Sequence, residues 1–251
     1  MTFDHLYYGT DEQTSVRMRG FGEQASRNIR ILVNVIRLTD MTMGWANLST
    51  INVDDIYEIE IMNGGSAVVL FGDGATGGAV HIITKNPNFV RDQFNFKTSL
   101  KSFSSKSKSF SYTKRINNFV VQSFASEEDT QGYRENSKFK SDIFNFDLSF
   151  LKDPTNRYFA KLNYSEQLTE IPVNITLTDF YTRPRYSRTP EDFGTEKVNS
   201  ISIGSQNILD TGTRFSNIFK FEDKDQTTSA LSGGRYILAK TNLETSTFSS
   251  K

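Results

Sequence analysis

Gly72, Gly74 and Gly77 are the first residues of this chain whose spacing could support chemistry. They form the pattern G-x-G-x-x-G directly after the apolar run Ala67–Phe71. In dinucleotide-binding folds such glycines bring backbone N–H groups to a pyrophosphate at a helix N-terminus. Here the following segment, Gly78–Pro87 (GAVHIITKNP), is short, β-branched and ends in proline, so it leaves no room for a helix of about 10–12 residues. A nucleotide-dependent enzyme is therefore the least favoured interpretation.

Other catalytic patterns are missing from the sequence. The two histidines, His5 and His81, lie far apart, and His81 falls within a strand pattern, so we expect it to be packed or hydrogen-bonded. With no cysteine and no Gly-x-Ser-x-Gly, no nucleophile is visible. The sequence has an acidic cluster, and we interpret it as a solvated turn and strand face in preference to a metal site. Its members are Asp54, Asp55, Glu58 and Glu60. We predict that the chain is not an enzyme and needs no cofactor or metal.

The composition favours β-sheet. The 251 residues include 21 Phe and 10 Tyr, and such aromatic weight suits sheet surfaces better than a helical bundle. Lys+Arg and Asp+Glu both total 29, so no net charge argues for nucleic acid as a partner. No run approaches the roughly 20 apolar residues of a membrane helix, and no secretion signal is visible at the N-terminus.

The strands and turns that must position any site fall into two regions with different sequence patterns. Residues 1–88 are punctuated by glycine, and strands are predicted at Ile29–Ile36, Tyr57–Met62 and Ala79–Thr84, with a helical turn near Asn52–Ile56.

From about Arg91 the sequence alternates with period two, as in Phe144, Phe146, Leu148 and Phe150 against Asn145, Asp147 and Ser149. The same pattern recurs around Phe94–Leu100, Tyr158–Tyr164 and Phe215–Phe221. Connections 151–156 and 207–213 are short, whereas 127–138 and 167–196 are long and polar. Short turns at one end and long loops at the other are typical of an outer-membrane barrel. A soluble sheet with one buried face would produce the same alternation.

Three segments, taken together, resemble the plug domain of TonB-dependent outer-membrane receptors. They are Val16–Glu23 (VRMRGFGE), Ile31–Asp40 (ILVNVIRLTD) and the run Val53–Lys85. The string covers residues 16–87, about a third of the chain, and segments 132–139 (GYRENSKF) and 171–185 are similar to early extracellular loops of such receptors. The resemblance implies a mainly β fold: a partial plug domain of small mixed α/β structure at residues 1–88, then the N-terminal portion of an antiparallel transmembrane β-barrel at 89–251.

The expected barrel is incomplete. A plugged transporter barrel has about 22 strands, whereas residues 89–251 suffice for about seven to nine at roughly 20 residues per strand. We therefore expect a fragment of a receptor that lacks the plug segment contacting the energising TonB complex. The family's usual Asp-Gly turn is Asn34-Val35 here, and Asn63-Gly64 stands where Arg-Gly is common, which removes one charged plug-to-barrel contact.

The resemblance also assigns structural roles within the plug. Its glycines permit tight reversals and positive φ, and its charged residues face the barrel wall, where we expect them to be paired, although solvated surface positions are an open alternative. The plug structural residues are Arg19, Gly20, Gly22, Glu60, Gly64, Gly72, Gly74, Gly77 and Gly78.

By resemblance, the chain serves active uptake of a scarce ligand such as a ferric siderophore or cobalamin in the bacterial outer membrane. Its partners would be outer-membrane lipid, the TonB complex and a small-molecule or metal-chelate ligand, and not nucleic acid. The predicted ligand-binding residues are Gly65, Ser66, Asp73, Tyr133, Arg134, Tyr181, Arg183 and Arg185. The alternative is a non-transporting β-sheet binding or structural protein, or an inactive remnant of a receptor gene.

Overall fold

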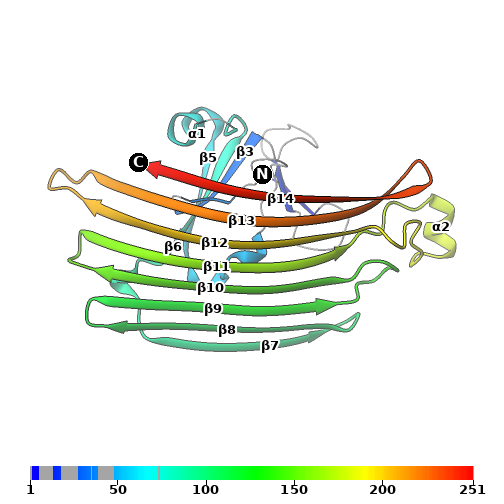
Figure 1. The fold of residues 1–251 in the computed structure, drawn as a ribbon, viewed down its shortest axis with the longest axis horizontal. Coiled ribbons are helices and arrows are strands. Elements are labelled where there is room, and N and C mark those ends of the chain that lie inside the picture. The colour runs from blue at the N-terminus through cyan, green and yellow to red at the C-terminus, as the bar shows by residue number, and fades with distance from the viewer. Residues whose placement is uncertain are drawn as a thin grey trace. The chain divides into compact units, whose positions relative to one another are not determined.

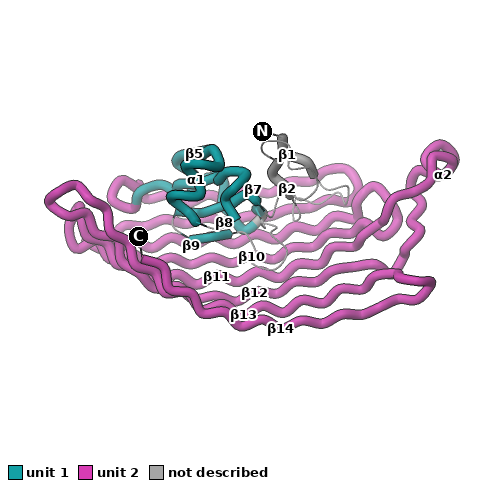
Figure 2. Tube along the Cα trace, turned by 90° about the horizontal axis from the view of Figure 1, so that it is seen from above, with its two compact units in different colours: residues 1–86 teal, residues 87–251 magenta. Residues whose placement is uncertain are grey.

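The computed structural model describes residues 2–5, 14–17, 28–34, 36–38, 48–72 and 74–250. The chain divides into two compact units, unit 1 at residues 1–86 and unit 2 at residues 87–251 (Figure 2). Within the described part of the chain, no helix has the length and apolar character needed to cross a membrane.

Unit 1 contains a two-stranded and a four-stranded sheet. The small sheet pairs β1 (Thr2–His5) with β2 (Thr14–Arg17) in antiparallel fashion. The larger sheet has the order β4-β3-β6-β5, in which β3 and β6 run parallel. Its elements are β3 (Ile29–Val33), β4 (Ile36–Arg37), β5 (Ile56–Asn63), helix α1 (Gly64–Phe71) and β6 (Gly78–Thr84), with 3₁₀ turns η3 (Leu48–Thr50) and η4 (Val53–Asp55).

The four-stranded sheet of unit 1 is apolar on both faces. Successive side chains of a strand point to opposite faces, so β3 and β6 contribute to two separate clusters. One contains Ile29, Ile31, Val80 and Ile82. The other contains Leu32, Ala67, Ala75 and Ala79, with Ala67 supplied by α1. Unit 1 therefore has its own core.

The predicted strand Ile29–Ile36 is wrong in one respect, because the chain turns at Asn34 and returns as β4. Asn34 has φ +56°, a left-handed conformation that asparagine tolerates better than most residues. Its Nδ2 donates to Thr84 Oγ1 at 2.9 Å and its Oδ1 accepts from Thr84 N at 3.0 Å, which fixes the turn against β6. Val35, which stands where the family resemblance expects the glycine of an Asp-Gly turn, lies outside the described residues.

The glycine pattern joins a helix to a strand. The apolar run before Gly72 is α1, and Gly78 begins β6, whereas a dinucleotide fold needs a strand before the glycines and a helix after them. Positive φ values occur at Gly72, Gly74 and Gly78, but Gly64 and Gly65 are helical.

Unit 2 is one curved, eight-stranded antiparallel sheet in which each strand pairs with its neighbours in sequence (Figures 1 and 2). This strand number lies within the predicted seven to nine. The 3₁₀ turn η5 (Pro87–Phe89) precedes the sheet. The strands are β7 (Gln93–Lys101), β8 (Ser105–Ile116), β9 (Phe119–Thr130), β10 (Phe139–Leu151), β11 (Asn156–Glu170), β12 (Phe193–Ile208), β13 (Arg214–Ser232) and β14 (Arg235–Ser250).

The connections differ between the two ends of this sheet. The turn end carries 117–118, 152–155 and 209–213, and the loop end carries 102–104, 131–138, 171–192 and 233–234. Helix α2 (Leu177–Thr182) lies in the longest loop-end connection. The strands lengthen along the chain, from 12 residues in β8 to 19 in β13. β9, β11 and β12 extend into the predicted loops 127–138 and 167–196, because residues 127–130, 167–170 and 193–196 pair within the sheet.

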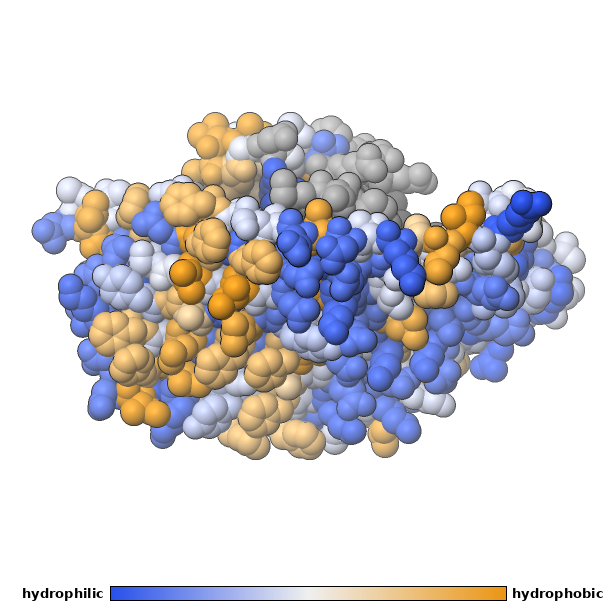
Figure 3. All heavy atoms as spheres, in the orientation of Figure 1, coloured by the Kyte–Doolittle hydropathy of each residue, from blue (hydrophilic) through white to orange (hydrophobic). Residues whose placement is uncertain are grey.

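The two faces of the eight-stranded sheet differ in chemistry. Phe146 of β10 lies opposite Ser123 and Leu162, and Leu162 lies opposite Ile201. The apolar face defined by this register contains Phe94, Phe96, Phe110, Tyr112, Val121, Phe144, Phe146, Leu148, Phe150, Tyr158, Leu162, Ile201, Ile203, Phe219, Phe221 and Phe248. Figure 3 shows hydrophobic side chains gathered over one part of the strands' length and hydrophilic ones over the rest. The opposite, polar face carries Asn145, Asp147 and Ser149.

Candidate functional site

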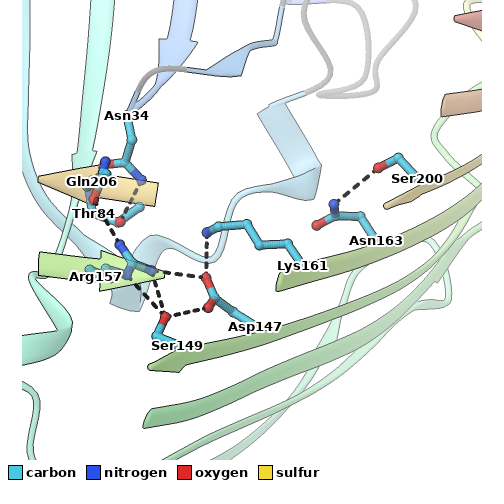
Figure 4. A network of polar contacts seen from close by, with 9 residues as sticks. All are labelled: Asn34, Thr84, Asp147, Ser149, Arg157, Lys161, Asn163, Ser200 and Gln206. Carbon is cyan, nitrogen blue, oxygen red and sulfur yellow. Dashed lines mark hydrogen bonds and ion pairs between the residues drawn. The ribbon is translucent and has the colours of Figure 1, made fainter. Parts of the chain in front are cut away.

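A network of charged side chains occupies the polar face across β10, β11 and β12 (Figure 4). Asp147 Oδ2 lies 2.5 Å from Lys161 Nζ and 3.5 Å from Arg157 Nη2. Ser149 Oγ donates to Asp147 Oδ1 at 2.8 Å and accepts from Arg157 Nε at 3.1 Å, while Arg157 Nη1 donates to Gln206 Oε1 at 3.3 Å. We call these five residues the polar-face network.

The polar-face network holds two cations around one carboxylate. The side chains of Asp147 and Arg157 are each 14% exposed and that of Lys161 is 23% exposed. Buried charges of this kind persist only when they are paired and hydrogen-bonded. The alternation places Asp147 on the polar side of its strand, but its partners depend on the β10–β11 register, which sets Asp147 opposite Lys161. The sequence therefore did not predict the network.

Further polar pairs continue along the same face toward the loop end. Gln167 Nε2 donates to Ser141 Oγ at 3.1 Å, and Asn163 Nδ2 donates to Ser200 Oγ at the same distance (Figure 4). Nearer the loop end, Lys224 Nζ lies 2.8 Å from Glu196 Oε2. Polar side chains that pair with one another therefore line this face from the turn end to the loop end.

At the loop end, Arg134 joins the connection 131–138 to the connection 171–192. Its Nη1 donates to the carbonyl oxygen of Pro172, and its Nη2 donates to those of Val173, at 2.9 Å, and Tyr186, at 2.8 Å. Burial lowers the pKa of the Arg134 guanidinium, and the negative charge of Glu135 opposes that shift.

Asn136 makes a second set of contacts between the same two connections. Its Nδ2 donates to the carbonyl oxygens of Thr189 at 2.7 Å and Asp192 at 2.9 Å, and its contact with Ile171 O is longer, at 3.4 Å. Glu135 lies between Arg134 and Asn136 in the sequence, and its backbone N–H donates to Arg185 O at 2.7 Å. Backbone and side chain together therefore bind the two connections along their length.

Aromatic rings and arginines surround these contacts. Arg185 lies over the Tyr133 ring with its Cζ 5.2 Å from the centroid, and Tyr133 packs edge-on against Phe103 of the 102–104 connection. Arg183 lies 3.8 Å from the centroid of the Tyr186 ring. Exposed cations on aromatic faces can bind anionic or π-rich groups.

Helix α2 carries exposed apolar side chains at the loop end. Leu177 is 73% exposed, Phe180 58% and Tyr181 75%. The helix is capped by Thr176, whose Oγ1 accepts from Asp179 N at 3.1 Å. Hydrogen bonds that Arg183 and Thr176 donate to the Asp179 carboxyl lower its pKa. The hydrogen bond between Arg183 and Asp179 also raises the pKa of the Arg183 guanidinium. The helix is thus short but fixed at both ends.

The structure brings together four of the predicted ligand-binding residues, Tyr133, Arg134, Arg183 and Arg185, in the paired connections, while Tyr181 lies exposed on α2. Arg134 is occupied by backbone carbonyls, which the sequence did not predict. In unit 1, Gly65 and Ser66 lie exposed in the first turn of α1. Asp73 lies outside the described residues. Ligand binding by these residues remains a prediction.

Among the predicted plug structural residues, Glu60 has a partner. Its Oε2 lies 3.0 Å from His81 Nδ1, and His81 Nε2 contacts the carbonyl oxygen of Asn34 at 2.5 Å, so the expected hydrogen bonding of His81 is confirmed. Gly64 is needed for close approach, because a Cβ there would lie 2.0 Å from Thr76 O. Gly77 N donates to Asn28 O at 2.7 Å.

Arg19, Gly20 and Gly22 lie outside the described residues. Over the residues that are described, no group of three or more His, Asp or Glu side chains is arranged to hold a metal ion.

A small mixed domain with glycine turns, followed along the chain by antiparallel hairpins with one apolar and one polar face, defines the plug-and-barrel class of β protein. Residues 5–79 match the family model described as "TonB-dependent Receptor Plug Domain". The predicted resemblance to TonB-dependent receptors is therefore confirmed, and so is the mainly β fold of a plug segment followed by barrel strands.

The similar proteins are transporters and receptors. The chain is 36% identical over 76 residues to the vitamin B12 transporter BtuB of Photobacterium profundum, a match that covers 30% of this chain and 12% of the transporter. The ferric yersiniabactin uptake receptor FyuA from Yersinia pestis matches 94% of this chain and 38% of its own (TM-score 0.75, 15% identity). The unliganded ferric citrate transporter FecA matches 92% of this chain and 36% of its own (TM-score 0.73, 17% identity). The chain thus spans well under half the length of these relatives.

Proposed function

We propose that this chain forms part of an outer-membrane TonB-dependent receptor that takes up a scarce ligand, such as a ferric siderophore or cobalamin. Residues 1–88 would act as plug and residues 89–251 as the first strands of the barrel. The observation that carries the proposal is the succession within one chain of a plug-family match and hairpins with opposed apolar and polar faces.

The apolar face supports a membrane location. Phe94, Phe219 and Phe248 are 65%, 46% and 69% exposed, although all three lie within strands of the sheet. Contiguous exposed apolar side chains mark a surface that binds a partner or a membrane, and a transmembrane barrel strand alternates an apolar lipid face with a polar lumen face. Outer-membrane lipid is therefore the proposed partner of the apolar face.

The loop end is the proposed ligand side. It combines exposed aromatic rings with the guanidinium groups of Arg183 and Arg185, a chemistry suited to anionic metal chelates. The remaining proposed ligand contacts are Gly65, Ser66, Asp73, Tyr133 and Tyr181. The contact predicted at Arg134 is not proposed, because its guanidinium nitrogens Nη1 and Nη2 donate to backbone carbonyl groups. The TonB complex is proposed to energise release by pulling on the plug.

An uptake assay tests the transport proposal. The gene that encodes this sequence, expressed with its genomic flanks in a bacterium lacking its own siderophore and cobalamin receptors, is expected to restore accumulation of a radiolabelled ferric siderophore or cobalamin. Inactivating the TonB complex should abolish it. Accumulation that persists without the TonB complex contradicts the proposal.

A pair of cysteine labels tests the membrane proposal separately. The chain has no cysteine, so Phe146→Cys and Asn145→Cys each place one polarity-sensitive fluorophore on opposite faces of β10. In lipid vesicles the label at 146 is expected to emit as in hydrocarbon and the label at 145 as in a polar setting. Identical emission from both, or recovery of the chain as a soluble monodisperse monomer, favours the alternative of a non-transporting β-sheet protein.

A further inference from the structure

The two longest loop-end connections, 131–138 and 171–192, are joined by hydrogen bonds that run mostly in one direction. Six of their side-chain hydrogen bonds run from Arg134 and Asn136 of 131–138 to backbone carbonyl oxygens of 171–192, and Glu135 Oε2 accepts a further one from Ser187 N at 3.2 Å. Arg134 contacts Pro172 O and Val173 O on the limb that leads into α2, and Tyr186 O on the limb that leads out of it. The guanidinium therefore bridges both limbs that flank the helix.

Asn136 repeats this arrangement nearer the sheet. Its amide contacts Ile171 O on the first limb and Thr189 O and Asp192 O on the second. Asn136 has φ +52°, a left-handed conformation that aims the short side chain back between the limbs. Arg134 and Asn136 of the connection 131–138 thus each bridge the two limbs of the connection 171–192, Arg134 nearer α2 and Asn136 nearer the sheet.

The paired connections are also attached to their neighbours on both sides. Asp192 Oδ1 accepts from Leu231 N of β13 at 2.8 Å. On the other side Gln131 N donates to Phe103 O at 3.1 Å, and the Tyr133 and Phe103 rings lie 5.5 Å apart. The paired connections are therefore tied to β13 on one side and to the 102–104 connection on the other.

We propose that Arg134 and Asn136 are positioning residues that make connections 131–138 and 171–192 a single rigid body and hold α2 in a fixed place at the loop end. Arg134 then acts through the loop it holds and does not itself contact a ligand. The benefit for ligand capture rests on the proposed function: Leu177, Phe180 and Tyr181 are presented without the entropy loss of ordering a 22-residue loop on binding.

The chemistry of the two side chains predicts which substitutions break the body. A planar guanidinium offers donors at fixed angles to several acceptors, whereas a lysine ammonium is a single point of charge. Arg134→Lys keeps the positive charge but loses the planar set of N–H donors. Asn136→Gly keeps the left-handed backbone conformation but loses the amide donor, so it should leave the fold of the sheet intact.

The test uses the full chain folded in detergent micelles, with a nitroxide spin label on Tyr181→Cys as the single cysteine. In Arg134→Lys and Asn136→Gly we expect the spectrum to shift to a mobile component. Amide hydrogen exchange across residues 171–192 should accelerate by about tenfold or more, while exchange in β10 and β11 stays unchanged. Arg188→Lys, a charge-conserving change at an exposed position of the same connection, is the matched control and should change neither readout.

Chemical rescue adds a readout that a general structural role would not move. Millimolar methylguanidinium is expected to restore exchange protection in Arg134→Ala but not in Asn136→Gly. Unchanged label mobility and exchange in both Arg134→Lys and Asn136→Gly overturn the proposal. So does acceleration that spreads equally through β10 and β11. Because no readout depends on uptake, failure of the receptor proposal would be seen separately.

Discussion

Units 1 and 2 are built from the same kinds of residue in opposite arrangements. Unit 1 buries Ile29, Ile31, Val80 and Ile82 together, as a protein in water does. Unit 2 instead buries many polar side chains, Gln167 and Ser149 among them, and leaves many of its phenylalanines exposed, although Phe139 and Phe159 are buried. The proposed membrane location accounts for this difference, because each unit then buries the side chains that its surrounding medium disfavours.

The largest expected effect comes from removing the one carboxylate of the polar-face network. Asp147→Asn leaves Arg157 and Lys161 buried without a counter-charge, and breaking such a group costs about 3–5 kcal/mol. Guanidinium unfolding in detergent micelles measures the loss. Asp142→Asn is the matched control, since its ion pair with Lys140 is exposed and is expected to contribute at most about 1 kcal/mol. Equal effects at both positions would show that unit 2 does not depend on a polar interior.

A charge placed on the apolar face of unit 2 tests whether the exposed apolar side chains face lipid. Phe146→Arg is expected to destabilise the sheet in lipid vesicles by about 2–4 kcal/mol, as arginine does near the middle of a lipid-facing strand. Asn199→Arg lies on the same face between Tyr164 and Asp223, beyond Ile201 and Ile203 of its own strand, and should change stability less. Tolerance of Phe146→Arg would argue that water covers this face.

Two neighbouring glycines sharpen the description of unit 1. A Cβ at Gly64 would meet Thr76 O at 2.0 Å, whereas a Cβ at Gly65 would meet nothing within 4 Å. Gly64→Ala is therefore expected to destabilise unit 1 by about 1–3 kcal/mol through overpacking. Gly65→Ala should stabilise it by about 0.5–1 kcal/mol, since alanine favours the helix. Exchange of β6 amide protons provides the measurement, and the reverse order would contradict the packing of α1.

The smallest effect is expected at the turn end. Asp153 Oδ1 accepts hydrogen bonds from Thr155 Oγ1 at 2.6 Å and Asn156 Nδ2 at 2.9 Å, and these bonds lower the pKa of its carboxyl from 3.8 to about 2. Because the folded pKa is depressed, the ionised carboxylate stabilises the turn above pH 3.8, and that contribution is lost as pH falls through about 2.

Carboxyl carbon NMR measures the titration of Asp153 directly. Thr155→Val removes one donor and is expected to raise the Asp153 pKa toward its ordinary value. A titration midpoint that Thr155→Val leaves in place would show that the turn is not held by this bond.

The sequence predicted the parts of the fold that depend on local patterns. Alternation at Phe144–Phe150 marks β10 because a half-exposed strand must repeat every two residues. The turn at Asn34 was missed, since the apolar residues on both sides of it read as one strand. Helix α1 was also not predicted, because the short apolar run Ala67–Phe71 has no period that separates helix from strand.

The candidate site was less accessible to sequence reasoning than the fold. Tyr133, Arg134, Arg183 and Arg185 were singled out by residue type, and the structure places them together. That Arg134 binds backbone carbonyls could not be predicted, because backbone acceptors carry no sequence signature. Asn136 was missed for the same reason. The tolerance of asparagine for the left-handed conformation, which Asn136 adopts with φ +52°, is a local signal that could have found it.

The unequal strand lengths of unit 2 have a consequence for anything that approaches the loop end. At about 3.4 Å per residue, β13 is roughly 24 Å longer than β8, since it has 19 residues against 12. The register places four of the seven extra residues, about 14 Å, at the loop end and three at the turn end, so the rim at the loop end is uneven in height. An antibody, protease or phage protein arriving from that side would reach the β13–β14 hairpin, at Gly233 and Gly234, well before it reached the short hairpin that joins β7 to β8.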